Sequence, residues 1–183
     1  MRVIAGEARG RTLTAPEGRT VRPTSDRVRE AVFNVLYSLG GVEGSVVVDL
    51  FAGSGALGIE ALSRGADHAV FVESDREALA AIETNLATLG LDDRAEVVAR
   101  DVWSWLEQHT GTVDLVFADP PYEFDRWDEL LAGLDAVRVV AESDRDVEAP
   151  TGWRLDRAKS YGATVVSILS RVEQPGQPVE GAP

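Results

Sequence analysis

The sequence predicts an α/β fold built on a mostly parallel seven-stranded sheet. Three observations support this prediction. From residue 45 onward, short apolar segments alternate with segments whose apolar residues recur every three or four positions. The first apolar segment runs into a glycine-rich turn and then a helix, as in a right-handed βαβ unit. Near the end of the chain, Tyr161-Gly162 separates two further strand-like segments and predicts a closing hairpin.

The predicted elements follow one another in a regular order. The segments rich in valine and other strand-forming residues predict strands at residues 46–51, 68–73, 95–99, 113–118, 136–141, 153–159 and 163–169. The amphipathic segments between the first five predict helices at residues 56–64, 76–89, 102–109 and 127–134. Strands that alternate with helices in this way form parallel pairs, because each helix crosses over one face of the sheet.

A separate unit precedes this alternation. Residues 2–5 and 11–15 flank a glycine-bounded turn and predict a small β-hairpin, which is too short to be stable unless it docks on the main body. After a loop at residues 16–23, Thr24 or Ser25 can cap a helix with an apolar face. We therefore expect an N-terminal extension at residues 1–22, a main domain at 23–170 and a disordered tail at 171–183.

Composition excludes several kinds of chemistry. The chain has no cysteine, which removes disulfides, thiolate metal sites and cysteine nucleophiles and suits a cytoplasmic protein. His68 and His109 lack the spacing of metal ligands, so we expect no metal. No apolar run approaches 18 residues, so we expect no membrane span.

Charge is distributed unevenly along the chain. The net charge is −13, yet residues 1–29 hold seven arginines against three acids. Such an asymmetry suggests contact with nucleic acid. Arginine is also the preferred base of this chain, which has one lysine. Charge alone therefore leaves both interpretations open.

The glycine-rich turn predicts a nucleotide-like cofactor. Residues 53–58, Gly-Ser-Gly-Ala-Leu-Gly, match G-x-G-x-x-G between a strand and a helix. Glu73 ends the next strand, 20 residues after Gly53, where a carboxylate can accept from ribose hydroxyls. An NAD-linked oxidoreductase is therefore a real alternative.

Acidic residues favour S-adenosylmethionine (SAM) over a dinucleotide. Asp49 would repel a pyrophosphate but would bind the ammonium group of SAM, whose carboxylate suits N–H groups at a helix start. Asp101, after the third strand, can accept from the adenine amine, and the neighbouring N–H can reach a ring nitrogen. These acids are alternatively ordinary strand-end, cap or solvated residues. The predicted cofactor-binding residues are Asp49, Phe51, Ala52, Gly53, Ser54, Gly55, Glu73, Ser74, Asp101 and Val102.

A second motif follows the fourth strand. Asp119-Pro120-Pro121-Tyr122 combines a carboxylate, two residues without an N–H and an aromatic ring. The Asp119 carboxylate and the Pro120 carbonyl can accept from an exocyclic amine and so localise its lone pair, while Tyr122 stacks on the base. All four residues are candidate catalytic residues, and a base that reaches them must be unpaired or flipped out. The alternative is a rigid turn with Tyr122 as a packing residue.

These motifs, with residues 2–6, 10–11 and 22–36, resemble the bacterial 16S rRNA guanine-N2 methyltransferase D family (RsmD). The resemblance implies a Rossmann-like class I SAM methyltransferase fold with strand order 3-2-1-4-5-7-6. It implies methylation of N2 of one guanine in the 16S rRNA of the small ribosomal subunit or its assembly intermediate, with S-adenosylhomocysteine as the by-product. It also implies an RNA-contacting N-terminal extension. We expect a monomer.

The expected RNA contacts come from the arginine-rich start of the chain. The alternative is that Arg22, Arg29 and Glu30 form ion pairs that lock the helix over the cofactor. Other open functions are a DNA adenine or protein glutamine N-methyltransferase, an NAD(P)-binding oxidoreductase, and an RNA-binding assembly factor that keeps a vestigial pocket. The predicted RNA-binding residues are Arg9, Arg11, Arg22, Thr24, Arg27 and Arg29.

Overall fold

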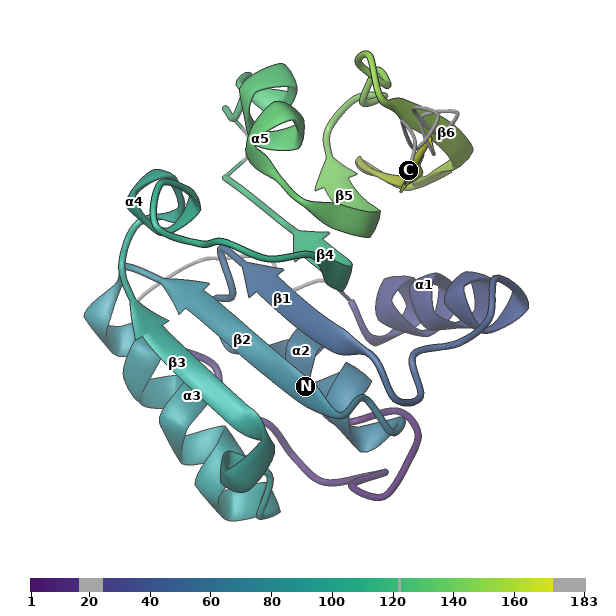
Figure 1. Ribbon diagram of the computed structural model, residues 1–183. Coiled ribbons are helices and arrows are strands. Elements are labelled where there is room, and N and C mark those ends of the chain that lie inside the picture. The colour runs from purple at the N-terminus through teal and green to yellow at the C-terminus, as the bar shows by residue number, and fades with distance from the viewer. Residues whose placement is uncertain (17–24, 122, 173–183) are drawn as a thin grey trace, which may run out of the picture.

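The computed structural model describes residues 1–16, 25–121 and 123–172. These residues form one seven-stranded sheet in the order β3-β2-β1-β4-β5-β7-β6 (Figure 1). Strands β3, β2, β1, β4 and β5 are parallel, whereas β7 is antiparallel to both of its neighbours. The predicted strand order is confirmed. The strands are β1 Val46–Leu50, β2 His68–Glu73, β3 Ala95–Ala99, β4 Val113–Ala118, β5 Ala136–Ser143, β6 Trp153–Tyr161 and β7 Thr164–Arg171.

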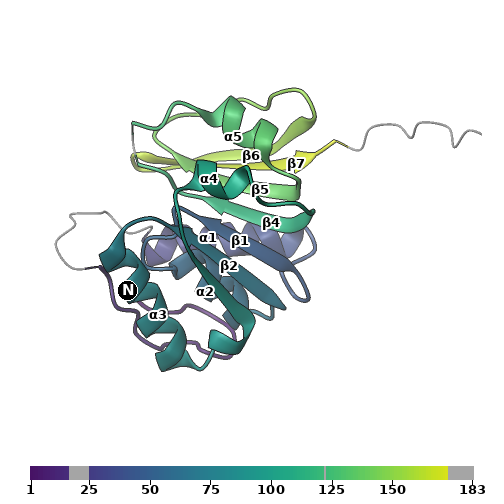
Figure 2. The same ribbon diagram turned by 60° about the vertical axis from the view of Figure 1, so that its left-hand side comes forward.

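Helices cover both faces of the sheet. In Figures 1 and 2, α4 and α5 lie on one side and α1, α2 and α3 on the other. A short 3₁₀ helix, which the sequence did not predict, spans Asp92–Arg94. The α-helices are α1 Asp26–Ser38, α2 Ala56–Ser63, α3 Arg76–Leu89, α4 Val102–Leu106 and α5 Trp127–Gly133.

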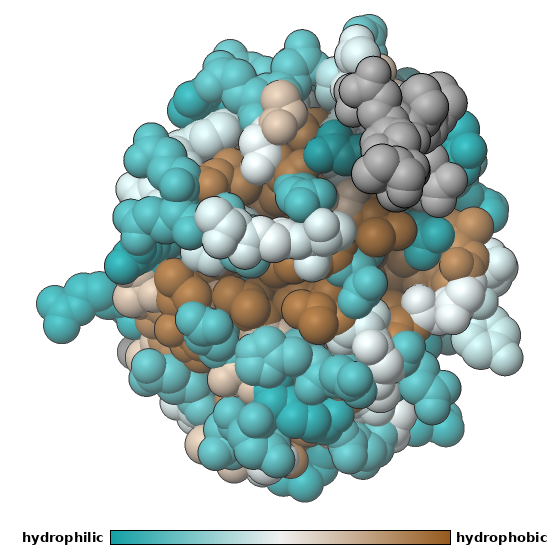
Figure 3. Space-filling view, viewed as in Figure 1, coloured by the Kyte–Doolittle hydropathy of each residue, from teal (hydrophilic) through white to brown (hydrophobic). Residues whose placement is uncertain are grey.

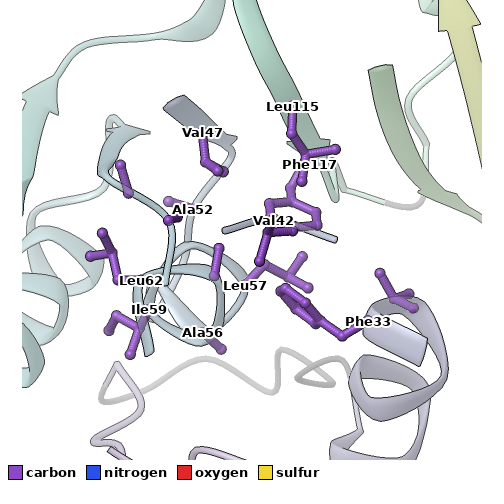
Figure 4. Packing of buried hydrophobic residues seen from close by; sticks show 14 of the residues in the cluster. Phe33, Val42, Val47, Ala52, Ala56, Leu57, Ile59, Leu62, Leu115 and Phe117 are labelled. Atoms are coloured by element: carbon purple, nitrogen blue, oxygen red, sulfur yellow. The ribbon is translucent and has the colours of Figure 1, made fainter. Parts of the chain in front are cut away.

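The strands alternate between two apolar cores. Val47 and Phe117 belong to the cluster beneath α1 and α2, whereas Val48 and Val116 belong to the cluster beneath α4 and α5. Figure 4 shows the first cluster, in which the rings of Phe33 and Phe117 lie with centroids 5.5 Å apart. Burial of each such side chain contributes about 1.5–3 kcal/mol. The sheet is therefore fixed from both sides.

Not all large apolar side chains are buried. Figure 3 shows a band of apolar side chains across one face of the molecule, with hydrophilic residues on both sides. Among the described helices, none is both long and apolar enough to cross a membrane. In the part of the chain that the structure describes, the exposed large apolar residues are Tyr37, Leu39, Val46, Val137, Leu155 and Val172.

Four elements, α4, β5, β6 and β7, end two or more residues from their predicted positions. The helix expected at residues 102–109 ends at Leu106, because the chain continues in turns that stack His109 on the Trp105 ring at 4.3 Å. Strand β5 extends to Ser143 because its last residues pair with Val165 and Val166 of β7.

The N-terminal segment of residues 1–16, called the arm below, docks as predicted and forms a short, irregular hairpin with three backbone hydrogen bonds between its two segments. Its only bridge within the described residues joins Arg2 and Thr12. Val3 and Leu13 are buried against the main body, and the arm runs across α2 and α3 (Figure 2). Strand β7 reaches Arg171, one residue past the predicted domain end. The rest of the expected tail, residues 173–183, and the loop at 17–24 lie outside the described residues.

Candidate functional site

A cavity of about 530 Å³ lies at the carboxyl ends of β1, β2, β4 and β5. Ligands of open α/β sheets bind at this edge. The cavity brings together both predicted motifs, although they are about 65 residues apart in the chain. The predicted residues that line it are Asp49, Phe51, Ala52, Gly53, Ser54, Glu73, Ser74, Asp119, Pro120 and Pro121.

The glycine-rich turn is held in a strained but well-packed conformation. Phe51 has a φ of 57°, which is unusual for a residue with a side chain and costs about 1–2 kcal/mol. Its ring packs edge-on against Phe124, with centroids 5.5 Å apart. A Cβ atom at Gly58 would lie 2.4 Å from Cε1 of Phe71. The third glycine of the motif therefore permits close packing of α2 on the sheet.

Asp49 is a buried carboxylate at the base of the cavity. Its Oδ2 accepts a hydrogen bond from the Gly58 N–H at 2.9 Å. Burial raises its pKa well above the usual value, and the negative charges of Asp119 and Glu73 act in the same direction. The site therefore favours a positively charged ligand over an anionic one, because a cation would stabilise the ionised form of Asp49.

Glu73 organises the turn before any ligand binds. Its Oε2 accepts from the Gly53 N–H at 2.9 Å, and its Oε1 accepts from the N–H groups of Ser74 and Asp75 at 2.7 and 2.8 Å. A carboxylate has about four acceptor positions, so Glu73 keeps room for one hydroxyl donor. The Gly55 N–H donates to the Ala52 carbonyl, so the N–H groups of both Gly53 and Gly55 already have partners within the chain.

The structure does not bring Asp101 and Val102 to the cavity. Asp101 is exposed and caps α4, accepting from the N–H and hydroxyl of Ser104 at 3.0 and 2.6 Å. These bonds lower its pKa. Val102 is buried in the core. In the structure Asp101 is a helix cap, which was the alternative interpretation of this residue. Gly55 was also expected at the cofactor site, and it does not line the cavity.

The Asp-Pro-Pro-Tyr motif follows β4 at the cavity rim. Asp119 is half-buried and Pro120 is buried. The Pro121 carbonyl accepts from the Phe124 N–H at 2.9 Å, which folds the segment back toward the cavity. Within the described part of the chain, no donor is bonded to the Pro120 carbonyl, so it is available to a ligand amine. Tyr122 lies outside the described residues.

Several cavity residues were not predicted as site residues. Phe124 and Trp127 form an aromatic wall, with ring centroids 5.0 Å apart. In the sequence these two aromatic residues follow Tyr122 at short intervals, and this spacing could have indicated them. The other missed residues come from the arm, the beginnings of α1, α2 and α3, the end of β5 and the closing hairpin, and they were not predicted as site residues from any local pattern. They include Met1, Ala15, Pro16, Ser25, Val28, Glu142, Ser143, Asp144, Tyr161 and Thr164.

The arginines of the N-terminal region divide into two groups. The side chain of Arg29 is fully buried and donates to the Arg2 carbonyl at 2.5 Å and to Asp26 at 2.9 Å. Its predicted role as an RNA contact is wrong, because RNA cannot reach it. Its carboxylate partners are Asp26 and, at 3.7 Å, Glu60, rather than the expected Glu30.

Other predicted RNA contacts remain accessible. Arg9, Arg11 and Arg27 are exposed. Arg11 donates to the Thr88 carbonyl at 2.7 Å, which fixes the arm on α3. The two remaining predicted contacts, Arg22 and Thr24, lie outside the described residues. Across residues 1–16, 25–121 and 123–172, no group of three acids or histidines is placed to hold a metal ion.

The fold and the cavity define a class of protein. A seven-stranded sheet in this order, with a glycine-rich turn after β1 and acids at the carboxyl ends of β1, β2 and β4, is the fold of class I methyltransferases. A family model described as "Conserved hypothetical protein 95" matches residues 1–170. The chain belongs to this family, and the predicted resemblance is confirmed.

Named relatives agree with this assignment. "Ribosomal RNA small subunit methyltransferase D" of Escherichia coli strain K12 is 37% identical, over 95% of this chain and 91% of its own length. YlbH of Bacillus subtilis strain 168 is 40% identical, over 93% of this chain and 99% of its own. The solved structure of yhhF from Escherichia coli matches with a TM-score of 0.83 and 37% identity, covering 95% of this chain and 99% of that one.

Proposed function

We propose that the protein is a SAM-dependent methyltransferase that acts on the exocyclic N2 amine of a guanine in 16S rRNA of the small ribosomal subunit. The observation that carries this proposal is the three carboxylates Asp49, Glu73 and Asp119 at one cavity, with the negative charge concentrated where a cationic methyl donor would bind. Membership of the family and the name of the Escherichia coli relative support the substrate class. The choice of the guanine N2 amine as the methylated group rests on the family resemblance.

The residues present fit the donor. Asp49 would bind its ammonium group, and the acceptor position left on Glu73 would bind a ribose hydroxyl. Phe51, Ala52, Ser54 and Ser74 would line the remainder of its site. When bound, SAM supplies an electrophilic methyl group on a sulfonium, and the nucleoside thioether that remains is S-adenosylhomocysteine.

Asp119 and Pro120 would act on the acceptor amine. A guanine amine is a poor nucleophile because its lone pair is delocalised into the ring. Hydrogen bonds from its two N–H groups to the Asp119 carboxylate and the Pro120 carbonyl localise that lone pair. The nitrogen then forms its bond to the methyl carbon as the carbon–sulfur bond breaks. Asp119 or water takes the proton that the nitrogen loses, and most of the rate comes from positioning.

The same charge pattern disfavours a dinucleotide. A pyrophosphate over the glycine-rich turn would face the negative charges of Asp49, Glu73 and Asp119. The accessible arginines Arg9 and Arg27, which line a neighbouring cavity, favour a nucleic acid over a protein substrate. The name of the Escherichia coli relative favours RNA over DNA. We propose that the arm, together with the predicted contacts Arg22 and Thr24, forms the RNA-contacting part of a monomeric enzyme.

The test of this function is methyl transfer to small ribosomal subunits that lack the modification, followed by mapping of the labelled base. The variant Asp119→Ala should lower the rate constant by about 100-fold or more, the usual range for a lost acid–base group. It should keep its affinity for SAM in calorimetry. Asp125→Ala, an exposed acid in the same loop, is the matched control and should transfer normally. Full activity of Asp119→Ala would contradict the proposed mechanism.

Asp49 gives an independent test of the donor site. The variant Asp49→Asn should weaken SAM binding by about tenfold or more, because a partly buried charge pair is lost. It should nevertheless raise the free energy of unfolding at pH 7, because ionised Asp49 is buried in the native state at a cost. That gain should disappear as the pH falls below the unfolded-state pKa, where Asp49 is protonated in both states. Urea unfolding at pH 3.5 and about 7 measures this, and unchanged SAM affinity would contradict the assignment.

A further inference from the structure

A second cavity, of about 390 Å³, lies between the arm and the start of α1. Three arginines line it, Arg2 and Arg9 from the arm and Arg27 from α1. We propose that this cavity binds a backbone phosphate of the RNA, next to the nucleotide whose base enters the larger cavity. This inference rests on the proposed function and adds a defined phosphate subsite to it.

The first argument is that these arginines have unused hydrogen-bonding capacity. No described residue forms a hydrogen bond or an ion pair with the side chains of Arg9 and Arg27. The side chain of Arg2 is 72% exposed, and its one contact is a distant ion pair with Asp26 at 3.9 Å. A guanidinium group presents a planar set of donors that matches phosphate oxygens. Three of them around one cavity form a site for an oxyanion.

The second argument is that the acids of this cavity do not cancel the arginines. Asp26 also lines the cavity, but it pairs at 2.9 Å with the buried Arg29, whose charge compensates it. Among the described residues, Glu30 is then the one lining carboxylate that forms no ion pair. Three guanidinium groups against Glu30 leave a positive site. The chain as a whole is strongly acidic, with a net charge of −13, so this positive site is a local exception.

The third argument is the position of the cavity. Met1, Ser25 and Val28 line the larger cavity, whereas the adjacent residues Arg2, Asp26 and Arg27 line the smaller one. The two cavities therefore lie side by side across the same two short stretches of chain. A nucleotide that swings out of its helix rotates about its own backbone, so its flanking phosphates stay at the rim of the pocket that receives the base. The arginine-lined cavity lies where such a phosphate would be.

The experiment compares the double variant Arg9→Ala/Arg27→Ala with Arg157→Ala. Arg157 is an exposed arginine on β6, at the edge of the sheet, and does not line either cavity. The double variant should raise KM for small subunits about tenfold or more and leave kcat and SAM affinity unchanged. The slope of log affinity for an rRNA fragment against log salt should fall by about 0.7–0.9 for each lost phosphate contact. Arg157→Ala should change none of these quantities.

A charge change in the opposite direction sharpens the test. Glu30→Gln removes the uncompensated acid and should lower KM for the small subunit by about twofold to fivefold, without an effect on SAM affinity. The subsite is overturned if the double variant keeps the KM and the salt slope of the natural protein. In that case methyl transfer by the natural protein still supports the proposed function. If the natural protein transfers no methyl group, the function fails, and anisotropy with the rRNA fragment decides the subsite separately.

Discussion

The N-terminal arm and the C-terminal hairpin of β6 and β7 are two additions to the parallel part of the sheet, and they are held in different ways. In the hairpin, backbone groups pair with each other from Trp153 and Arg171 to Tyr161 and Thr164 at the turn. The arm has one bridge and three backbone hydrogen bonds between its two segments, and several of its other backbone groups bond to buried side chains of α2 and α3. The hairpin is thus held by a long ladder of its own, whereas the arm adds to a short ladder the hydrogen bonds that it makes with the helices beneath it.

Three polar residues of α2 and α3 add to this short ladder. Glu60 of α2 accepts from the N–H groups of Ile4 and Ala5 at 2.8 and 3.0 Å. Ser63 accepts from the Ala8 N–H at 3.0 Å. Asn85 of α3 exchanges two hydrogen bonds with Thr14 and also donates to the Ser54 carbonyl at 3.0 Å. The arm is therefore joined directly to the glycine-rich turn that we assign to the donor.

The largest expected effect comes from Gly6→Ala. Gly6 has a φ of 81°, and a Cβ atom there would lie 1.6 Å from the Ser63 carbonyl oxygen. The arm cannot stay docked, so burial of Val3 and Leu13 is lost and the free energy of unfolding should fall by about 4 kcal/mol. Because the arm forms one side of the cavity, methyl transfer should fall about 100-fold or more. Urea unfolding and transfer assays measure both.

Gly10→Ala is the matched control for this variant. Gly10 has the same φ of 81°, but an added Cβ would meet nothing within 4 Å. Its cost should be the backbone strain alone, about 1–2 kcal/mol. Equal losses in the two variants would show that strain, rather than contact with α2, is what matters at Gly6.

The second prediction removes the buried charge beneath the arm. Glu60 is fully buried and lies between Arg29 at 3.7 Å and Arg64 at 2.7 Å. Glu60→Gln leaves Arg29 buried without this partner and should lower the free energy of unfolding by about 3 kcal/mol. Glu83→Gln, at an exposed position on α3, should change it by less than about 0.5 kcal/mol. A loss at Glu60 no larger than at Glu83 would mean that the arm is held by apolar contacts.

The third prediction tests the joint between the arm and the glycine-rich turn. Asn85→Ala leaves the Thr14 N–H and two carbonyl groups without their partner and should lower the free energy of unfolding by about 2 kcal/mol. Because the same side chain contacts Ser54, SAM affinity should fall as well. Thr84→Ala, the exposed neighbour on α3, is the control and should leave SAM affinity unchanged. Calorimetric titration with SAM separates the two variants.

The sequence could predict the features that depend on local signals, but not those that depend on contacts between distant residues. The strands, the helices and both motifs follow from periodicity and glycine position, which are local signals. The strand order follows from the family resemblance. The position of Arg29 follows from neither, because its burial depends on Asp26 and on Glu60, which is 31 residues away in the chain. Asp101 was expected to line the cavity and does not, for a related reason. A carboxylate after a strand can face the site or cap the next helix, and its bonds to Ser104 decide between them.

The smallest expected effect comes from Gly162→Ala in the hairpin turn. Gly162 has a φ of 68° and is the first residue of a two-residue loop, where a type II′ turn requires glycine. An added Cβ would meet nothing within 4 Å, so the cost should be about 1–2 kcal/mol of backbone strain. The ladder of β6 and β7 should persist, and methyl transfer should fall much less than for Gly6→Ala. If the hairpin variant instead loses transfer to the same degree while it stays folded, then Tyr161 and Thr164, which line the cavity, contribute as much to the site as the arm does.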